Sequence, residues 1–360
     1  MTIPPLDWDW WTRAAEYQGE LIMPRGALGR LLELGRQLCA AQRTLACRAE
    51  PAAVLVLAAD HGIAAEGVSA YPQEVTAQMV VNYLQGTAAV NVLARRLGMR
   101  VVVADLGMKT PVSAHHPDYV PDLAVARGTA NFLHGPAMTP AEVAAALAAG
   151  RRIVAERLSD VRVLALGEMG IGNTTSAAAL AAALTGQPAE AVTGRGTGLD
   201  DAGYRHKLHV VTQAVQRHGL SPATPPLSVL AAVGGLEIAG LVGAAIEAAA
   251  RQMLVVLDGF ISSVAGLLAV RLEPALAGYL VAGHRSREPG HAVVLEALKL
   301  RPLLELDMSL GEGSGAVLAV HLIQSAADVM TRMATFDAAG VSRRLDSAPR
   351  RERADQIRSD

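Results

Sequence analysis

The stretch AAVLVLAADHG at residues 52–62 carries the pattern that decides the fold. Its apolar run is continuous and is closed by Asp60, His61 and Gly62. A short, continuous apolar run that ends in a polar turn is typical of a parallel strand buried on both faces. The stretch therefore predicts a buried strand with polar side chains at its carboxyl end.

The same pattern recurs along the chain. Further runs of this kind are RVVVADLG (100–107), VRVLALGEMG (161–170), MLVVLDGF (253–260) and YLVAGH (279–284). Ala-rich helical patterns separate them, as in α/β proteins. We therefore expect a three-layer α/β/α domain around a parallel, Rossmann-like sheet, plus a smaller helical domain from the N- and C-terminal segments. In such sheets, ligands bind outside the carboxyl ends of the strands.

Helical spacing and composition predict how the chain is divided. We expect an N-terminal helical arm at 1–50, a catalytic α/β domain at 51–315, a C-terminal helix at 316–342 and a disordered, charged tail at 343–360. An amphipathic helix is predicted at 23–46, and Cys39 and Cys47, eight residues apart, are expected in one helix. Other helices are predicted at 72–96, 137–158, 175–184, 205–218 and 226–250.

Composition excludes several classes of function. Lys and Arg number 32 against 34 Asp and Glu, and this net charge of −2 gives no global signal for nucleic acid or acidic membranes. The most apolar stretch, 226–250, contains Glu237 and Glu247 and is typical of buried helices, not of a membrane span. The cysteines lack zinc-site spacing and the first residues lack a signal-peptide pattern, so we expect a cytoplasmic protein with reduced thiols.

The segment GEMGIGNTTS at 167–176 is a candidate anion site. It follows a predicted strand and opens an Ala-rich helix, where backbone N–H groups favour an anion. It matches neither a Walker loop nor the dinucleotide fingerprint. A plain strand-to-helix turn with Asn and Thr as caps is the alternative.

A second glycine-rich segment, TGRGTGLDDAGYRHK at 193–207, would suit a compact phosphate ligand. It combines spaced glycines with Arg195, Arg205 and Lys207 in a chain that has few other basic clusters. The alternative is a surface loop with ordinary ion pairs.

Two carboxylates are candidates for acid–base chemistry. Glu312 lies between Gly311 and Gly313 before an apolar helix, so it can approach a ligand closely. Burial in a pocket would raise its pKa and make it a better proton acceptor near neutral pH. Glu168 lies in the first glycine-rich segment and could steady developing positive charge. Helix capping or an Arg partner is the alternative for Glu312.

Other polar segments are less specific. Tyr71, Gln78 and Met79 could line a pocket for a flat apolar group or serve ordinary helix packing. Asp60 and His61 do not define a metal site, and capping and loop hydrogen bonds are expected for them. Asp258, at a strand end, could orient a ligand group or cap a helix. The segment GHRSREPGH at 283–291 is predicted to be a structural or dimer-contact loop.

Taken in order, these blocks resemble the nicotinate-nucleotide:dimethylbenzimidazole phosphoribosyltransferases of cobalamin synthesis. The blocks that carry the resemblance are PRGALGRL, ADHGIAAEGVSAYPQEVT, GTAAVNVLAR, GEMGIGNTT, TGRGTGLDD, LDGF, GHRSREPGH, LGEGSGAVLA and the ending MATFDAAGVS. They span roughly residues 20–342. The Trp-rich start DWDWW and the charged tail lie outside the pattern.

The resemblance implies transfer of 5-phosphoribose from nicotinate mononucleotide to 5,6-dimethylbenzimidazole, giving α-ribazole 5′-phosphate and nicotinate. It implies Glu312 as the general base, with Glu168 as a second catalytic carboxylate. The phosphoribose residues implied by motif are Gly170, Gly172, Asn173, Thr174, Gly196, Lys207 and Asp258. The benzimidazole residues are Tyr71, Gln78, Met79 and Leu310. The family implies a homodimer without a metal or other cofactor.

Two other functions can be weighed against this one. A nucleotide-dependent oxidoreductase would need a G-x-G-x-x-G turn after the first strand, but that strand ends in ADHGIAAEG. A non-catalytic nucleotide-binding protein would keep the loops without the chemistry, and the retained Glu312 speaks against it. Adenine, phenols and other benzimidazoles stay open as acceptors.

Overall fold

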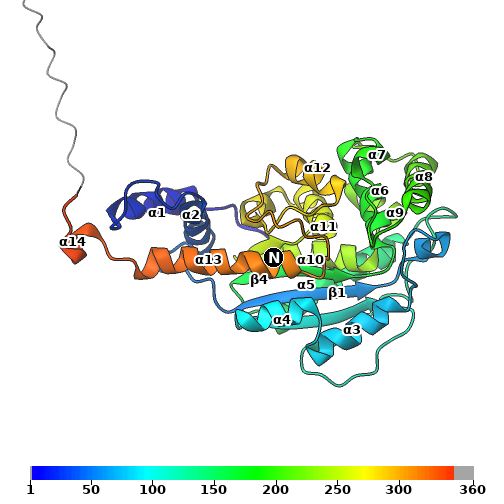
Figure 1. The fold of residues 1–360 in the computed structure, drawn as a ribbon, viewed down its shortest axis with the longest axis horizontal. Coiled ribbons are helices and arrows are strands. Elements are labelled where there is room, and N and C mark those ends of the chain that lie inside the picture. Colours follow the sequence, from blue (N-terminus) through cyan, green and yellow to red (C-terminus); the bar gives the residue numbers. More distant parts are fainter. Residues whose placement is uncertain (1, 344–360) are drawn as a thin grey trace, which may run out of the picture.

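Six parallel strands form one sheet in the computed structural model, which describes residues 2–343 (Figure 1). The strands are β1 (Ala52–Ala59), β2 (Arg100–Gly107), β3 (Tyr119–Val120), β4 (Val163–Met169), β5 (Leu254–Leu257) and β6 (Leu280–Ala282). Their order is β3-β2-β1-β4-β5-β6, and every neighbouring pair is parallel. The predicted α/β fold with a parallel sheet is confirmed.

Helices cover both faces of this sheet because the strand side chains alternate in direction. Leu57 of β1 lies against Gly240 of α10 (Leu236–Ala250). Val54, three residues earlier, lies against Gly313 at the start of α13 (Ser314–Arg332) on the other face. Helices α3 (Val75–Gln85) and α4 (Ala89–Arg96) join α13 on that face, and α5 (Pro140–Arg157) packs behind α10. The prediction of buried helices at 226–250 is confirmed by α9 (Pro226–Val233) and α10.

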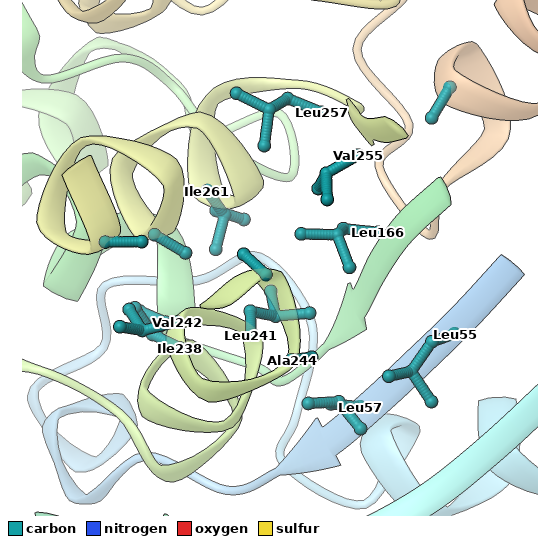
Figure 2. Packing of buried hydrophobic residues seen from close by; sticks show 14 of the residues in the cluster. Leu55, Leu57, Leu166, Ile238, Leu241, Val242, Ala244, Val255, Leu257 and Ile261 are labelled. Carbon is teal, nitrogen blue, oxygen red and sulfur yellow. The ribbon is translucent and has the colours of Figure 1, made fainter. Parts of the chain in front are cut away.

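The core on the α10 face is built from strand side chains that meet two helices (Figure 2). Leu55, Leu166 and Leu257 come from β1, β4 and β5, and each is fully buried. Leu241 of α10 and Ile261 of α11 (Phe260–Leu272) lie opposite them. Burying a side chain of this size contributes about 1.5–3 kcal/mol, so the core holds the strand ends, and the loops that follow them, in a defined register.

Helices α5 and α10 approach so closely that glycine is required where they meet. A Cβ on Gly150 would lie 1.9 Å from the Gly240 carbonyl oxygen. A Cβ on Gly243 would lie 2.0 Å from the carbonyl oxygen of Leu147. Any side chain at either position would force the two helices apart.

We expect Gly150→Ala to lower the free energy of unfolding by about 1–3 kcal/mol, the usual cost of overpacking a close-packed interface. Alanine has the better helix propensity by about 1 kcal/mol, which offsets part of this loss. Urea unfolding of both proteins measures the difference. Gly19→Ala is the control, because a Cβ there, in α1 (Trp8–Glu20), meets only ordinary contacts. Equal midpoints for the Gly150→Ala and Gly19→Ala variants would contradict the steric argument.

The N- and C-terminal segments lie side by side at the end of the molecule away from α6 to α9 (Figure 1). Helices α1 and α2 (Arg30–Gln42) pack on each other, and α2 packs on α13. The chain returns through a bridge between Leu21 and Thr335 before α14 (Phe336–Ala339). The domain limits at residues 50 and 315 stay a prediction.

Several predicted helix limits were wrong. The expected helix at 23–46 is α2 alone, because Arg43 adopts a left-handed φ of 54° and ends it, so Cys47 lies beyond the helix. The pattern at 72–96 is two helices, because Gly86, at φ 72°, terminates α3. The short edge strand β3 was not predicted. The remaining elements are η1 (Gly62–Glu66), α6 (Asn173–Thr185), α7 (Ala189–Val192), α8 (Asp201–Arg217), η2 (Pro274–Tyr279) and α12 (Pro289–Leu298).

Within residues 2–343, no helix combines the length and apolar character needed to cross a membrane. Of the charged tail predicted at 343–360, residues 344–360 lie outside the described part of the chain. Arg343 is described, and its guanidinium forms an ion pair with Asp337 at 3.1 Å.

Candidate active site

A cavity of about 600 Å³ opens at the carboxyl edge of the sheet. This volume is in the usual range of small-molecule sites. Its walls come from the loops after β1, β4, β5 and β6 and from the segment before α13. The predicted residues that line it are Tyr71, Met79, Glu168, Gly170, Asn173, Thr174, Gly196, Leu310 and Glu312. Gly172, Lys207, Asp258 and Gln78 lie outside the lining.

A larger hollow of about 870 Å³ lies elsewhere, at the amino end of β1. It is lined by residues 46–52, by Leu97 and Gly98, and by the C-terminal part of α13. None of the predicted site residues is among them. Because parallel sheets bind ligands at the opposite edge, the smaller cavity is the better candidate.

One corner of the cavity is suited to an anion. Helix α6 starts there after Gly172, which adopts a left-handed φ of 98°. Lys207 reaches the corner from α8, and its Nζ donates to Thr174 Oγ1 at 2.8 Å. Gly196, at φ 53°, closes the corner, and a Cβ there would lie 2.8 Å from both of these atoms. A helix N-terminus and an ammonium group together favour a phosphate.

The ammonium group of Lys207 is fully buried. Burial lowers the pKa of Lys207 to about 8, while the carboxylate of Glu288 opposes this shift. Arg205 is exposed, and Arg195 forms a surface ion pair with Asp201 at 2.5 Å. Of the three basic side chains in the second glycine-rich segment, Lys207 is therefore the one that reaches Thr174 at the anion corner.

Glu312 has an unusual backbone. Gly311, Glu312 and Gly313 adopt left-handed φ values of 86°, 65° and 91° in succession. This conformation costs little for glycine but is unfavourable for glutamate, and such strain is common at functional sites. Flanking glycines therefore allow the chain to turn Glu312 toward the cavity. The Glu312 N–H points to Glu168 Oε1 at 3.4 Å.

Asp258 holds this turn from behind. Its Oδ1 accepts the N–H groups of Gly315 at 2.7 Å and Ala316 at 2.9 Å, and its Oδ2 accepts that of Gly313 at 3.1 Å. The carboxylate therefore caps α13, and its side chain is only 2% exposed. The structure shows the helix-cap role that the sequence left open for Asp258, and a contact of Asp258 with phosphoribose stays a prediction.

The carboxyl group of Glu312 is buried and, among residues 2–343, its Oε2 has no hydrogen-bond partner. Burial raises the pKa of Glu312, and the nearby Tyr83 hydroxyl and Asp258 charge lower and raise it, respectively. The Tyr83 hydroxyl is itself unpartnered in the described chain, so the two groups face each other without a closed hydrogen bond. A raised pKa in a carboxyl group that borders the cavity suits a proton acceptor.

Glu168 lies next to Glu312 and is buried to a similar extent. Burial, then the charges of Asp258 and Glu237, raise the pKa of Glu168 to about 8. Its Oε2 accepts from the side-chain amide of Asn173. Burial thus favours the neutral form of Glu168, which weakens the expectation that it steadies positive charge.

An apolar wall also borders the cavity. It consists of Tyr71, Val75, Met79, Ile171 and Leu310, of which Tyr71 and Leu310 are more than half exposed at the rim. Such a wall suits a flat aromatic ring.

The prediction that Gln78 lines this wall is not supported. Gln78 is exposed on α3, because successive helix positions are about 100° apart and Val75 and Met79 take the inner face.

Sequence reasoning missed part of the lining. Phe260 and Ile261 follow β5, and His284, Ser286 and Glu288 follow β6. The segment GHRSREPGH was predicted to be a structural or dimer-contact loop, and it also forms a cavity wall. The signal was present, because this segment follows a strand at the carboxyl edge as the other site loops do.

The expected loop hydrogen bonds of Asp60 and His61 are confirmed. Asp60 Oδ2 accepts the Lys109 N–H at 2.8 Å. His61 bonds to Ser176 and Glu237 below the anion corner.

Comparison with known proteins gives consistent matches along the chain. A family model described as phosphoribosyltransferase matches residues 3–341. The chain is 50% identical over 344 residues to the nicotinate-nucleotide–dimethylbenzimidazole phosphoribosyltransferase of Chloroflexus aurantiacus, covering 95% of this chain and 97% of that protein. It is 49% identical over 334 residues to the protein of the same name from Pseudomonas aeruginosa, covering 92% and 94%.

A solved structure agrees with these matches. The crystal structure of CobT from Thermus thermophilus is similar to this one with a TM-score of 0.89 and 48% sequence identity, over 93% of this chain and 99% of that chain. The family match begins at residue 3, so it includes the Trp-rich start that the sequence blocks had placed outside the pattern.

Proposed function

The chain belongs to the nicotinate-nucleotide–dimethylbenzimidazole phosphoribosyltransferase family, and from this membership we propose its reaction. It transfers 5-phosphoribose from nicotinate mononucleotide to 5,6-dimethylbenzimidazole. The products are α-ribazole 5′-phosphate and nicotinate, and the reaction serves the synthesis of the nucleotide loop of cobalamin.

One observation carries this proposal. The anion corner around Lys207 and Thr174, the carboxyl group of Glu312 and the apolar wall all border one cavity. A phosphate, a proton acceptor and a place for a flat ring are what this reaction requires. Holding the two substrates together in one cavity contributes much of the rate, because positioning replaces a bimolecular encounter.

The leaving group needs no acid. The ring nitrogen of nicotinate mononucleotide is quaternised, so breaking the glycosidic bond releases neutral pyridine nitrogen and leaves positive charge on the ribose. The transition state therefore resembles an oxocarbenium ion. The residues of this chain have only to bind the phosphate and to receive the acceptor from the other side of the sugar.

The acceptor does need a base. The benzimidazole nitrogen that attacks belongs to a ring with an N–H on its other nitrogen, and this proton must leave as the new bond forms. We assign its removal to Glu312, whose carboxyl group borders the cavity and has a raised pKa. A positioned base contributes about 10²–10⁴-fold to the rate.

We assign Glu168 a supporting part. Its Oε1 is 3.4 Å from the Glu312 N–H, and its other oxygen bonds Asn173 at the start of α6. Glu168 would thus link the base loop to the anion corner and keep the two at a constant separation.

We also propose a homodimer, on the basis of the family resemblance. A cytoplasmic location is proposed as well, in keeping with the free thiols of Cys39 and Cys47.

The direct test is to mix the protein with nicotinate mononucleotide and 5,6-dimethylbenzimidazole and to follow nicotinate and α-ribazole 5′-phosphate by chromatography and mass spectrometry. Nicotinate should appear only when both substrates are present. Binding of the mononucleotide without product would favour the non-catalytic alternative and overturn the proposal.

The two shifted pKa values predict a bell-shaped pH profile. Glu312 must be ionised to accept a proton, and its pKa is raised, so kcat should fall on acidification at a higher pH than for an ordinary glutamate. Lys207 must be protonated to bind phosphate, and its pKa is about 8, so the KM for the mononucleotide should rise as the pH passes 8. Steady-state kinetics from about pH 5 to 9.5 measure both limbs.

Ionisation of the phosphate of nicotinate mononucleotide does not contribute to the rise of the KM on the alkaline side. A phosphate monoester loses its second proton with a pKa of about 6, so its charge is constant above about pH 7.5. The KM for 5,6-dimethylbenzimidazole serves as the control and should stay level. A flat KM for the mononucleotide across the alkaline range would contradict the assignment of Lys207.

A further inference from the structure

A buried polar cluster lies below the anion corner and has no part in the mechanism above. His61 Nδ1 is 2.9 Å from Ser176 Oγ, and His61 Nε2 is 2.7 Å from Glu237 Oε1. All three side chains have no solvent exposure. They come from three elements: the end of β1, the first turns of α6 and the first turn of α10.

The imidazole ring is packed between glycines. A Cβ on Gly170 would lie 3.2 Å from the ring atom Cδ2, and a Cβ on Gly235 would lie 2.3 Å from Cε1. A Cβ on Gly172 would lie 3.3 Å from His61 Cβ. Gly170 and Gly172 form the loop that opens α6, so this loop rests directly on the histidine.

The two hydrogen bonds set the orientation of the ring. A proton shared between His61 Nε2 and Glu237 Oε1 holds one side of the ring, whichever of the two atoms carries it. Nδ1 then faces a hydroxyl that can either donate or accept, and this hydroxyl belongs to Ser176 in the N-terminal part of α6. A carboxylate–histidine pair of this kind fixes ring geometry around metal sites, and here it fixes a helix start.

Stability alone is a poor explanation for the cluster. Glu237 Oε2 has no hydrogen-bond partner in the described part of the chain, so the buried carboxylate is only half satisfied. Buried charged groups of this kind often stabilise a fold no better than apolar residues of equal volume. The cluster lies directly under the loop that borders the cavity, and this position indicates a functional role.

We propose that His61, held by Glu237, is a positioning residue for the phosphate subsite. Through Ser176 and the glycines at 170 and 172 it fixes the first turn of α6, and thereby the direction of the N–H groups offered to the phosphate of the mononucleotide. The proposal rests on the reaction proposed above.

The mildest test is Ser176→Ala, which removes one hydroxyl and adds no atom. Losing one hydrogen bond of the positioning chain should raise the KM and the dissociation constant for nicotinate mononucleotide by about 3- to 10-fold. The values of kcat and of the KM for 5,6-dimethylbenzimidazole should stay within about 2-fold, since the base and the apolar wall are untouched. A purely structural hydroxyl would instead lower the melting temperature and leave the KM unchanged.

A second pair of variants tests Glu237. Glu237→Gln keeps an oxygen that can accept from Nε2, so its KM should stay close to that of the parent. Glu237→Met has a similar volume without that acceptor and should raise the KM as Ser176→Ala does. Thr185→Ala is the matched control, because it removes a hydroxyl hydrogen bond at the other end of α6, to the Ala181 carbonyl at 2.6 Å, and should leave the KM unaltered.

Calorimetry with nicotinate mononucleotide distinguishes a failure of the positioning role from a failure of the proposed reaction. Weaker binding to Ser176→Ala and Glu237→Met than to Thr185→Ala and Glu237→Gln supports the positioning role. Equal binding by all four variants overturns it and leaves the proposed reaction intact. A parent protein that does not bind the mononucleotide would overturn the proposed reaction itself.

Discussion

Replacing Glu312 with Gln is expected to lower kcat by about 10²–10⁴-fold, the usual contribution of a general base. Glutamine has nearly the same shape as glutamate, so the left-handed turn at φ 65° between two glycines should persist. Its amide cannot take the benzimidazole proton. The dissociation constant for nicotinate mononucleotide should change little, because the anion corner is formed by other residues.

Single-turnover assays of nicotinate release and calorimetry with the mononucleotide measure the two quantities separately. Glu305→Gln is a matched control, since Glu305 is an exposed carboxylate in the segment that leads to the same turn. The control should keep its parent turnover. If Glu312→Gln also kept it, another group would have to accept the proton, and the assigned role would be wrong.

Lys207→Met is expected to raise the KM for nicotinate mononucleotide by about 10- to 100-fold, the effect of losing a hydrogen bond from a charged group. Methionine fills much of the same buried space, so the variant removes the charge with little loss of packing. The KM for 5,6-dimethylbenzimidazole should stay unchanged. The rise of the KM for the mononucleotide near pH 8 should also be reduced, because the ammonium group with a pKa of about 8 is gone, although Glu168, whose pKa is also about 8, remains.

Arg205→Met supplies the control for Lys207. It removes a positive charge from the same helix at an exposed position, so only weak long-range electrostatics are lost. An equal rise of KM in both variants would show that net charge, and not the buried ammonium group, binds the phosphate. An unaltered KM in Lys207→Met would remove Lys207 from the subsite.

The sheet could be predicted because its strands are buried on both faces. Continuous apolar runs such as the one at 52–59 have few alternatives in a chain of this composition, and each is closed by glycine and polar residues. The position of the site followed, since the carboxyl ends of parallel strands meet at one edge.

Helix limits were less predictable because they depend on single backbone angles. Arg43 ends α2 in a left-handed conformation, and nothing in the residue type arginine predicts that conformation. The strand at 119–120 is too short to leave a pattern, and it exists only because β2 offers it an edge.

Within the site, the direction of individual side chains was harder to predict than the loops that carry them. Gln78 and Met79 are adjacent in sequence, but only Met79 borders the cavity. For Asp258 the sequence left a ligand contact and a helix cap open, and the structure shows that both of its oxygens cap α13. His284 and Glu288 were assigned to a structural loop and form part of the wall.

The sequence by itself determined the fold class, the family and the loops that carry the site, because these depend on hydrophobic patterns and ordered motifs that are local along the chain. Only the tertiary structure decided which carboxyl group is left with a free oxygen, which basic side chain is buried and what lies beneath the anion corner. Glu168 approaches Glu312, and His61 bonds to Ser176 and Glu237, across long stretches of chain. Charge state and orientation at such contacts depend on burial and on neighbours from other elements, and these exist only once the sheet and its helices have packed.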